Sequence, residues 1–234
     1  MVKQSIIKWL GHASFQITSQ AGKTILIDPW LGGPTCPVKI DDLKQVHLVL
    51  ITHDHFDHAG DAAELIKKTK AILVANVETA NRFKSELGIE AESIVHGGYG
   101  MNIGGNARIG DITVTMTQAF HSSMTGSPCG YIIRLEDGKN IYHAGDTGIF
   151  STMAIFGDIY EIDVALLPIG GGFTMDPVQA AKAVELLKPK KVIPMHFQTF
   201  PFLEQDTENF EKEIKRRKIK VDIIVLSPGG ETVL

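Results

Sequence analysis

The stretch LITHDHFDHAGDAAEL, residues 50–65, places three histidines and two aspartates within six consecutive positions, directly after a run of apolar residues. Imidazole and carboxylate groups in such density are typical ligands of first-row divalent metals. The apolar LVLI before them is typical of a strand buried on both faces, and the apolar spacing becomes helical from Ala59 onward. The stretch therefore predicts a metal-binding turn between a buried strand and a helix.

Three further candidate ligands lie far downstream, and each follows a predicted strand: His121, Asp146 and His196. Side chains at the strand ends of one sheet edge face a common cleft, so these residues can complete the coordination begun by the first cluster. Seven protein ligands result, a set that suits two metal ions sharing a bridging carboxylate. The members are His53, His55, Asp57, His58, His121, Asp146 and His196.

The rest of the chain predicts an α/β protein of the αββα type, with two mixed β-sheets packed face to face and helices on the outer faces. Strands predominate at the front of each half of the chain, and helices alternate with strands at the back. No linker or repeat divides the sequence, so we expect a single domain over residues 1–234. Helices are expected near residues 59–69, 76–88, 176–188 and 206–218, and one strand over residues 221–234.

The composition favours a soluble protein of a reducing compartment. The formal charge of -4 gives no overall attraction to nucleic acid or anionic membranes. Cys36 and Cys129 are too few for a disulfide framework. Neither a signal peptide nor an apolar run of membrane-spanning length is recognisable, so we expect a cytoplasmic protein without a membrane segment.

Several short motifs together resemble one known family. The segment THDHFDH matches the HxHxDH motif of the metallo-β-lactamase fold, and Asp28 in ILIDP matches its early aspartate motif. The later candidate ligands follow in the family's order. The chain resembles this family from about Ile6 to Gly230. Within the family, WLGHASF, ILIDPWL, AGDTG and LPIGGGFTM are most similar to the uncharacterised metal-dependent hydrolases related to ascorbate-6-phosphate lactonase.

The resemblance implies a role for each candidate. It assigns one metal to His53, His55 and His121, and a second metal to Asp57, His58 and His196, with Asp146 bridging them. Asp28 would orient the ligands from behind, and Asp54, in the variable position of the motif, would not be a ligand. Two divalent ions are implied, zinc first and manganese second, with nickel, iron or cobalt also suited to these ligands. The residues assigned to catalysis are Asp57, Asp146 and His12.

The implied activity is metal-dependent hydrolysis. A metal-bridging hydroxide would attack an ester, lactone or phosphodiester of a small molecule. One alternative is a di-iron redox protein, but those relatives carry Glu where this chain has His55. Another is a nuclease or phosphodiesterase that acts on nucleic acid, for which the acidic chain shows no basic arm. The substrate, the native metal and the oligomeric state stay open, and a homo-oligomer is compatible with the sequence.

The sequence also predicts roles for the remaining histidines and for two loops. His12 either packs behind the first strand or reaches the cleft, and His143 is expected to be a buried partner of the ligands. His47 and His96 are expected to be structural. The glycine-rich loop at residues 170–172 lies near the expected cleft, and Thr174 and Met175 after it are candidates to line the pocket. The long loop 30–42 is a candidate rim or lid.

Overall fold

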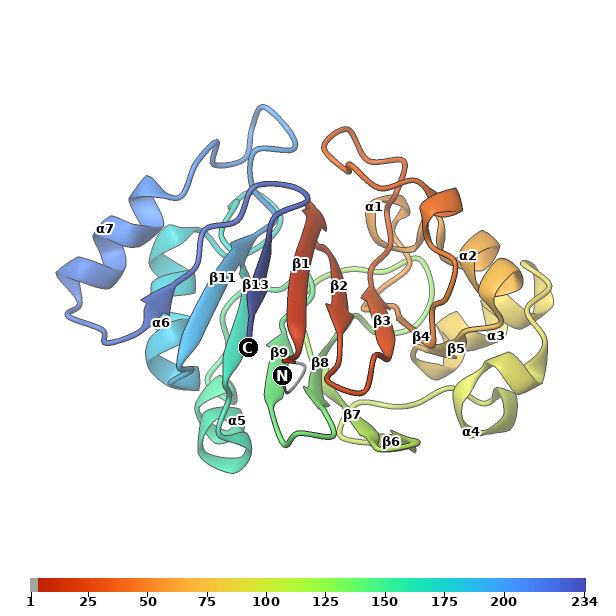
Figure 1. Cartoon of the computed structure of the whole chain (residues 1–234). Coiled ribbons are helices and arrows are strands. Elements are labelled where there is room, and N and C mark those ends of the chain that lie inside the picture. The colour runs from red at the N-terminus through yellow and green to blue at the C-terminus, as the bar shows by residue number, and fades with distance from the viewer. Residues whose placement is uncertain (1–3) are drawn as a thin grey trace.

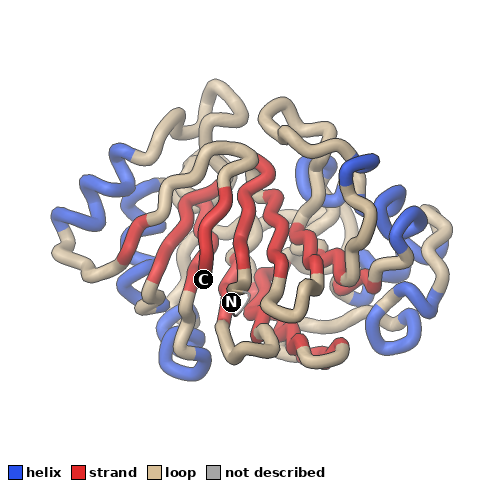
Figure 2. Tube along the Cα trace, in the orientation of Figure 1, coloured by secondary structure: helices blue, strands red, loops and turns tan. Residues whose placement is uncertain are grey.

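Two mixed β-sheets, packed face to face, form the centre of the molecule (Figure 1), and helices flank them on both sides (Figure 2). The computed structural model describes residues 4–234. Six strands form the first sheet in the order β13 (Glu231–Val233), β1 (Ile6–Gly11), β2 (Ser14–Thr18), β3 (Thr24–Ile27), β4 (Leu48–Leu50) and β5 (Ile72–Val74). Seven form the second in the order β12 (Asp222–Ile223), β11 (Lys191–Met195), β10 (Val164–Pro168), β9 (Asn140–His143), β8 (Cys129–Arg134), β7 (Ile112–Gln118) and β6 (Asn106–Ile109). The predicted αββα architecture is confirmed.

The helices lie in two groups, one beside each sheet (Figure 1). The first group is α1 (Phe56–Ala59), α2 (Ala62–Thr69), α3 (Val77–Ser85) and α4 (Val95–Gly98), and the second is α5 (Met153–Tyr160), α6 (Pro177–Leu187) and α7 (Glu208–Arg216). Helices were expected at α2, α3, α6 and α7 and are confirmed there, whereas α4 and α5 were not expected. None of the helices within residues 4–234 is both long and apolar enough to cross a membrane.

Alternation along the strands of the first sheet divides the apolar side chains between two cores. Ile25 and Ile27 of β3 point into the core between the sheets, whereas Leu26 packs with the buried faces of α2 and α3 on the outer side. Strand β4 is buried on both faces in the same way, as predicted. The core between the sheets takes side chains from both sheets. The single domain over residues 1–234 stays a prediction.

The end of the chain departs from the expected single strand over residues 221–234. Strand β12 pairs with β11 in the second sheet, and β13 pairs with β1 in the first. Between them a turn with Pro228 and Gly229 interrupts the extended run; Gly229 has a φ of +85° and its N–H donates to the Trp9 carbonyl at 2.7 Å. The segment therefore joins the two sheets instead of extending one of them.

Candidate metal centre

The candidate ligands follow strands of both sheets and lie at one edge of the molecule's central sheets. Asp28 follows β3, His53 follows β4, His121 follows β7, Asp146 follows β9 and His196 follows β11. His12 lies in the turn between β1 and β2, so the prediction that it reaches the cleft is the one that the structure supports. Three residues of this edge adopt the left-handed backbone region, which is uncommon outside glycine: His12 (φ 52°), Asp28 (φ 47°) and His196 (φ 56°). Such backbone strain is concentrated at functional sites.

One group of candidate ligands consists of three histidines. His53, His55 and His121 each offer a ring nitrogen, and these nitrogens all lie within 4.8 Å of one another. His53 Nε2 lies 2.9 Å from His55 Nδ1. The predicted first ligand set is therefore brought together.

The second group contains four residues. Asp57, His58 and His196 were expected here, and His12 joins them, with one donor atom from each within the same 4.8 Å limit. His12 Nε2 lies 3.2 Å from Asp57 Oδ2, and His12 Nδ1 lies 3.0 Å from the hydroxyl of Thr199. The ring of His12 thus holds the Asp57 carboxylate and is itself held from the loop after β11. Sequence reasoning did not identify Thr199.

Asp146 lies between the two groups. Its Oδ2 is 3.0 Å from His196 Nε2, 3.4 Å from His58 Nε2 and 3.6 Å from His121 Nε2. The carboxylate therefore faces histidines of both groups, as a bridging ligand would.

A second layer of polar groups fixes the orientation of the rings. Asp28 accepts at Oδ2 from the Thr52 hydroxyl at 2.6 Å and lies 2.8 Å from His58 Nδ1. The same Thr52 hydroxyl is 3.1 Å from His53 Nδ1. Each contact occupies one ring nitrogen and leaves Nε2 facing the cleft, which is the arrangement that supports metal-binding histidines.

Asp54 organises the loop that carries His121. Its carboxylate accepts from the main-chain N–H of Met124 at 2.7 Å and from the hydroxyls of Ser123 at 2.8 Å and Thr125 at 2.6 Å. It also pairs with Arg82 at 2.8 Å. Asp54 is not among the candidate ligands, in agreement with its place in the motif, but its positioning role was missed because its partners lie about 70 residues further on.

Burial and charge act in opposite directions on the pKa values of the candidate ligands. Burial lowers the pKa of His53 to about 3 and that of His12 to about 4. Burial alone would also lower the pKa of His58, but the carboxylates of Asp146 and Asp28 raise it well above its usual value. The buried Asp146 carboxyl has a pKa well below its usual range because His196 and His58 favour its charged form.

Several buried ligand atoms lack a partner. Within residues 4–234, His58 Nε2, Asp146 Oδ1 and His196 Nδ1 have no hydrogen bond. Buried polar atoms are nearly always satisfied, so unpaired nitrogen and carboxylate atoms in one cluster fit a cation held among them. The donor set contains more imidazoles than carboxylates and no thiolate, so its imidazoles suit zinc and its carboxylates also suit manganese.

A cavity of about 450 Å³ opens over the ligands. It is lined by His55, Phe56, Asp57, His121, Ser122, Asp146, Phe173, His196, Phe200 and Phe202. The expectation that Thr174 and Met175 line the pocket is wrong, because the turn after Gly171 directs Phe173 outward and buries the next two side chains. From the loop 30–42, Trp30 reaches the rim, 5.5 Å from the ring of His12.

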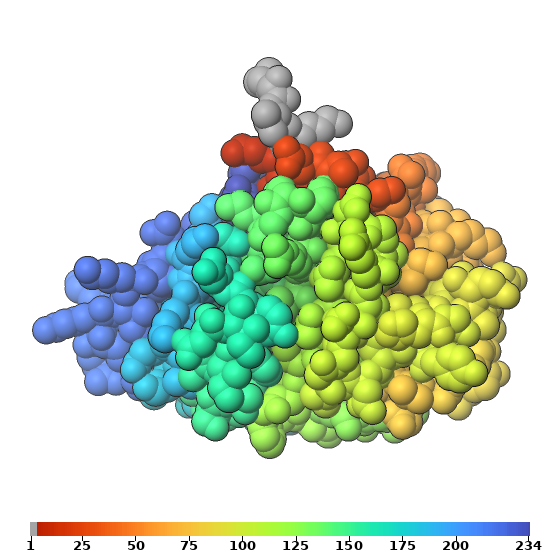
Figure 3. Space-filling view, turned by 90° about the horizontal axis from the view of Figure 1, so that it is seen from below, coloured from red at the N-terminus to blue at the C-terminus, as the bar shows by residue number. Residues whose placement is uncertain are grey.

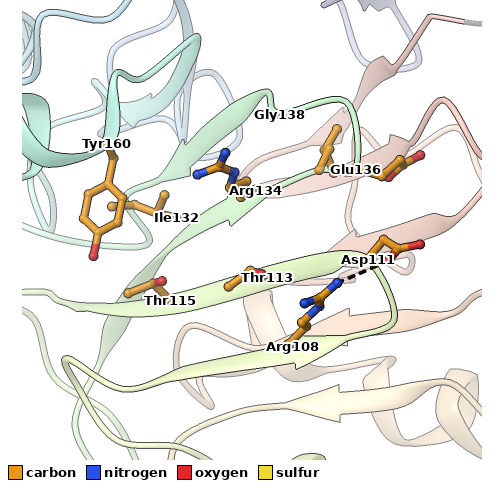
Figure 4. Close-up of a pocket in the computed structure, with 10 residues that line it drawn as sticks. Arg108, Asp111, Thr113, Thr115, Ile132, Arg134, Glu136, Gly138 and Tyr160 are labelled. Carbon is orange, nitrogen blue, oxygen red and sulfur yellow. Dashed lines mark hydrogen bonds and ion pairs between the residues drawn. The ribbon is translucent and has the colours of Figure 1, made fainter.

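A larger cavity of about 610 Å³ lies elsewhere, on the outer face of β7 and β8 (Figure 4). The view from below shows the chain around β6 to β9, yellow-green to green, in the middle of the surface (Figure 3). Arg108, Thr113, Thr115 and Arg134 line this cavity without any histidine or cysteine, and Arg108 pairs with Asp111 at 3.4 Å. Its carboxylates, Asp111 and Glu136, are not part of any close group of three metal-type donors among the described residues, so the candidate centre is the smaller cavity.

The other histidines lie outside the ligand groups. His143 is fully buried, 3.0 Å from the Ala13 carbonyl through Nε2, and accepts from the Gly145 N–H through Nδ1. His47 accepts from the Thr24 N–H at 3.1 Å. His96 lies 3.0 Å from the Gly100 carbonyl. All three contact main chain, which agrees with a structural role for His47 and His96. His143 is buried as expected, and it contacts both the first turn, at Ala13, and the main chain directly before the candidate ligand Asp146, at Gly145.

Residues 23–197 match the family model described as the beta-lactamase superfamily domain. The chain belongs to the metallo-β-lactamase superfamily. It is 46% identical over 232 residues to a UPF0173 metal-dependent hydrolase of Nitratidesulfovibrio vulgaris (strain DP4), with 99% of this chain and 96% of that protein covered. A UPF0173 metal-dependent hydrolase of Caldivirga maquilingensis is also 46% identical, with 95% of each chain covered.

A solved structure shows the same fold. Igni18, described as a novel metallo hydrolase from the hyperthermophilic archaeon Ignicoccus hospitalis, superimposes with a TM-score of 0.89 at 35% identity and covers 99% of this chain and 98% of its own. This member of the metallo-β-lactamase superfamily is therefore a metal-dependent hydrolase, as the HxHxDH motif predicted.

Proposed function

We propose that the centre binds two divalent metal ions and hydrolyses an ester, lactone or phosphodiester of a small molecule. Zinc is the first choice and manganese the second, and the donors also accept nickel, iron or cobalt. When bound, such ions supply a hydroxide at neutral pH and polarise the oxygen of the scissile bond. The observation that supports the proposal is the position of Asp146 Oδ2, within 3.6 Å of histidines from both groups.

The residues of the two groups would have different roles at the centre. One ion would be held by His53, His55 and His121, the other by Asp57, His58 and His196, with Asp146 shared. Asp57 and Asp146 present carboxylates to the cavity over the centre. His12 would keep Asp57 in place, since its ring is fixed between that carboxylate and Thr199.

The test begins with the metal content of the purified protein and a panel of lactones, phosphodiesters, thioesters and β-lactams, offered to protein loaded separately with zinc and with manganese. His53→Ala and Asp146→Ala should each lose bound metal and reduce hydrolysis to background. His96→Ala, which removes a ring outside the ligand groups, is the matched control and should retain both. Full hydrolysis by either ligand variant would falsify the proposal.

The two rival functions have distinct signatures. A di-iron redox protein would show a strong visible ferric band after aerobic purification and no hydrolysis across the panel. The relatives named as hydrolases support the hydrolytic reading instead. A nuclease would bind single-stranded RNA in a salt-sensitive way, and the net charge of -4 does not favour that. The proposed partner is a small-molecule substrate.

A further inference from the structure

We propose that the part of the substrate away from the reacting bond is neutral and aromatic or aliphatic, and that a cluster of phenylalanines at the mouth of the metal centre binds it. The cluster, called the aromatic rim below, consists of Phe56, Phe173, Phe200 and Phe202, with Trp30 behind them. The inference rests on the proposed function and adds the class of substrate.

The rings of the aromatic rim form a continuous series. Phe202 stacks on Phe200 at 5.7 Å between ring centroids, with the two planes 2° apart, and meets Phe173 edge to face at 5.4 Å. Trp30 continues the series, 6.2 Å from Phe200 and 5.7 Å from Phe56. The residues come from four separate segments of the chain, so local sequence does not explain why they meet. The four phenylalanines share a cavity with His55, His121 and Asp146, so a group bound on their rings lies beside the candidate reacting bond.

The outer rings of the aromatic rim are exposed although they are large and apolar. Phe56 is 68% exposed, Phe173 65% and Phe202 60%. A contiguous exposed apolar patch at the mouth of a cavity marks a binding surface more often than scattered apolar residues do. Dispersion and burial of such rings favour an apolar occupant.

The aromatic rim is held in place by main-chain hydrogen bonds. The loop after β11 is joined to the loop after β10 where the Glu204 N–H donates to the Gly170 carbonyl at 3.0 Å. Within the loop after β11, the Gln198 N–H donates to the Glu204 carbonyl at 2.7 Å. Gly170 lies against the His196 main chain so closely that a Cβ there would clash. The rings of Phe173 and Phe202 are thus presented by segments that are tied to each other and to a ligand residue, which lowers the entropic cost of binding.

The charges around the cavity argue against an anionic tail. Among the described residues that line it, there is no lysine or arginine, and the two carboxylates, Asp57 and Asp146, belong to the ligand groups. Arg82 lines the adjoining cavity but is already paired with Asp54 at 2.8 Å. A phosphate or carboxylate away from the reacting bond would therefore lie against aromatic rings without a cation to pair with.

Binding is measured first because it does not depend on turnover. N-phenyl-1-naphthylamine, a neutral fluorophore, is titrated into the metal-loaded full chain. It is then displaced by 2-(4-methylphenyl)acetamide or by 2-(4-carboxyphenyl)acetamide, which differ in charge at the end of the ring away from the amide. The neutral amide should displace the fluorophore at a concentration at least about tenfold lower. Hydrolysis of the 4-nitrophenyl esters of the two matching acids should show a kcat/KM preference of similar size.

Variants assign the preference to the aromatic rim. Phe202→Ala and Phe173→Ala should each reduce the neutral-to-anionic ratio several-fold, and Phe202→Arg should shift it toward the carboxylate. Ile159→Ala removes an equally exposed apolar side chain (62%) from α5 and should leave the ratio unchanged.

The outcomes separate the two proposals. Preferential binding without hydrolysis of either ester would support the aromatic rim and count against the proposed function. Hydrolysis of both esters at equal kcat/KM would overturn the inference while the proposed function stands. If sedimentation shows that Phe202→Arg dissociates an oligomer while the ratio is unchanged, the patch is a contact between copies of the chain and the inference is overturned.

Discussion

Asp28 Oδ2 and His58 Nδ1 lie 2.8 Å apart, and both side chains are completely buried. The carboxylate holds the ring so that Nε2 faces Asp146 at 3.4 Å. Partners of this kind orient a ligand and raise its basicity, and their loss typically lowers metal affinity by about 10- to 100-fold.

Asp28→Asn should therefore weaken metal binding by about that factor while the fold is kept, because the amide preserves the size of the side chain. Competition with a chromogenic chelator measures the affinity, and circular dichroism checks the fold. Asp41→Asn, at a carboxylate 87% exposed and paired with Lys68, serves as the control. An unchanged affinity in the folded Asp28→Asn protein would show that the buried contact has no effect on the ligand.

Replacing Asp54 by alanine should loosen the loop around His121. The variant leaves the main-chain N–H groups of Met124 and Thr125, which lie in a partly exposed loop, without their carboxylate acceptor, and the loss of a typical hydrogen bond costs about 0.5–1.5 kcal/mol. We expect faster hydrogen exchange at residues 121–125 and reduced occupancy of the metal proposed to bind at His121, both measurable by mass spectrometry. Glu86→Ala, which removes the other partner of Arg82, should change neither. Normal exchange in the Asp54 variant would contradict this role.

The residues that the structure brings together as candidate ligands could be predicted because their signal is local and ordered. Five titratable residues in six positions are visible without any structure, and His121, Asp146 and His196 follow strands whose apolar runs are recognisable. Helix α6 was equally readable, since Pro177 begins it and Asp176 caps it by accepting from the Gln179 N–H at 2.8 Å.

Other features depend on contacts distant in sequence. Helix α5 was missed because its apolar residues show no clear one-sided spacing and Gly157 lies within it. The aromatic rim depends on how the loops after β10 and β11 turn, which places Phe173 outward and Met175 inward. The contacts of Asp54 likewise join segments that no local pattern connects. These features depend on tertiary contacts, which leave no periodic pattern of residues in a single sequence.

Acidification should destabilise the metal-free protein between pH 6.5 and about 4. Burial lowers the pKa of His53 to about 3 and of His12 to about 4, so over this range the unfolded chain takes up protons at these rings that the folded protein does not. The stability is complete above the ordinary histidine pKa of 6.5 and is lost as the pH falls. Each such proton corresponds to about 1.4 kcal/mol per pH unit.

Urea unfolding of chelator-treated protein at several pH values measures this slope. His58 acts in the other direction: its raised pKa contributes stability that is present below pH 6.5 and is lost as the pH rises, so the curve should pass through a maximum near neutrality. On the acid side of the maximum, His12→Gln should reduce the slope of the free energy of unfolding against pH. The reduction should be at most the slope that corresponds to about one proton. The same acid slope in that variant would mean that His12 does not stay neutral in the folded protein.

Tyr131→Phe should lower the free energy of unfolding by about 1–2 kcal/mol. The Tyr131 hydroxyl, fully buried on β8 of the second sheet, donates to the Ile51 carbonyl at 2.7 Å and lies 3.1 Å from that of Val74, so it joins the second sheet to the end of β4 just before His53. Phenylalanine keeps the ring and leaves the Ile51 carbonyl without this donor. Urea unfolding of metal-free protein measures the loss, with Tyr99→Phe, 75% exposed, as the control. Because Ile51 leads directly into the turn that carries His53 and His55, metal affinity should fall together with stability. A loss of stability at constant metal affinity would show that this turn keeps its geometry without the Tyr131 hydrogen bond.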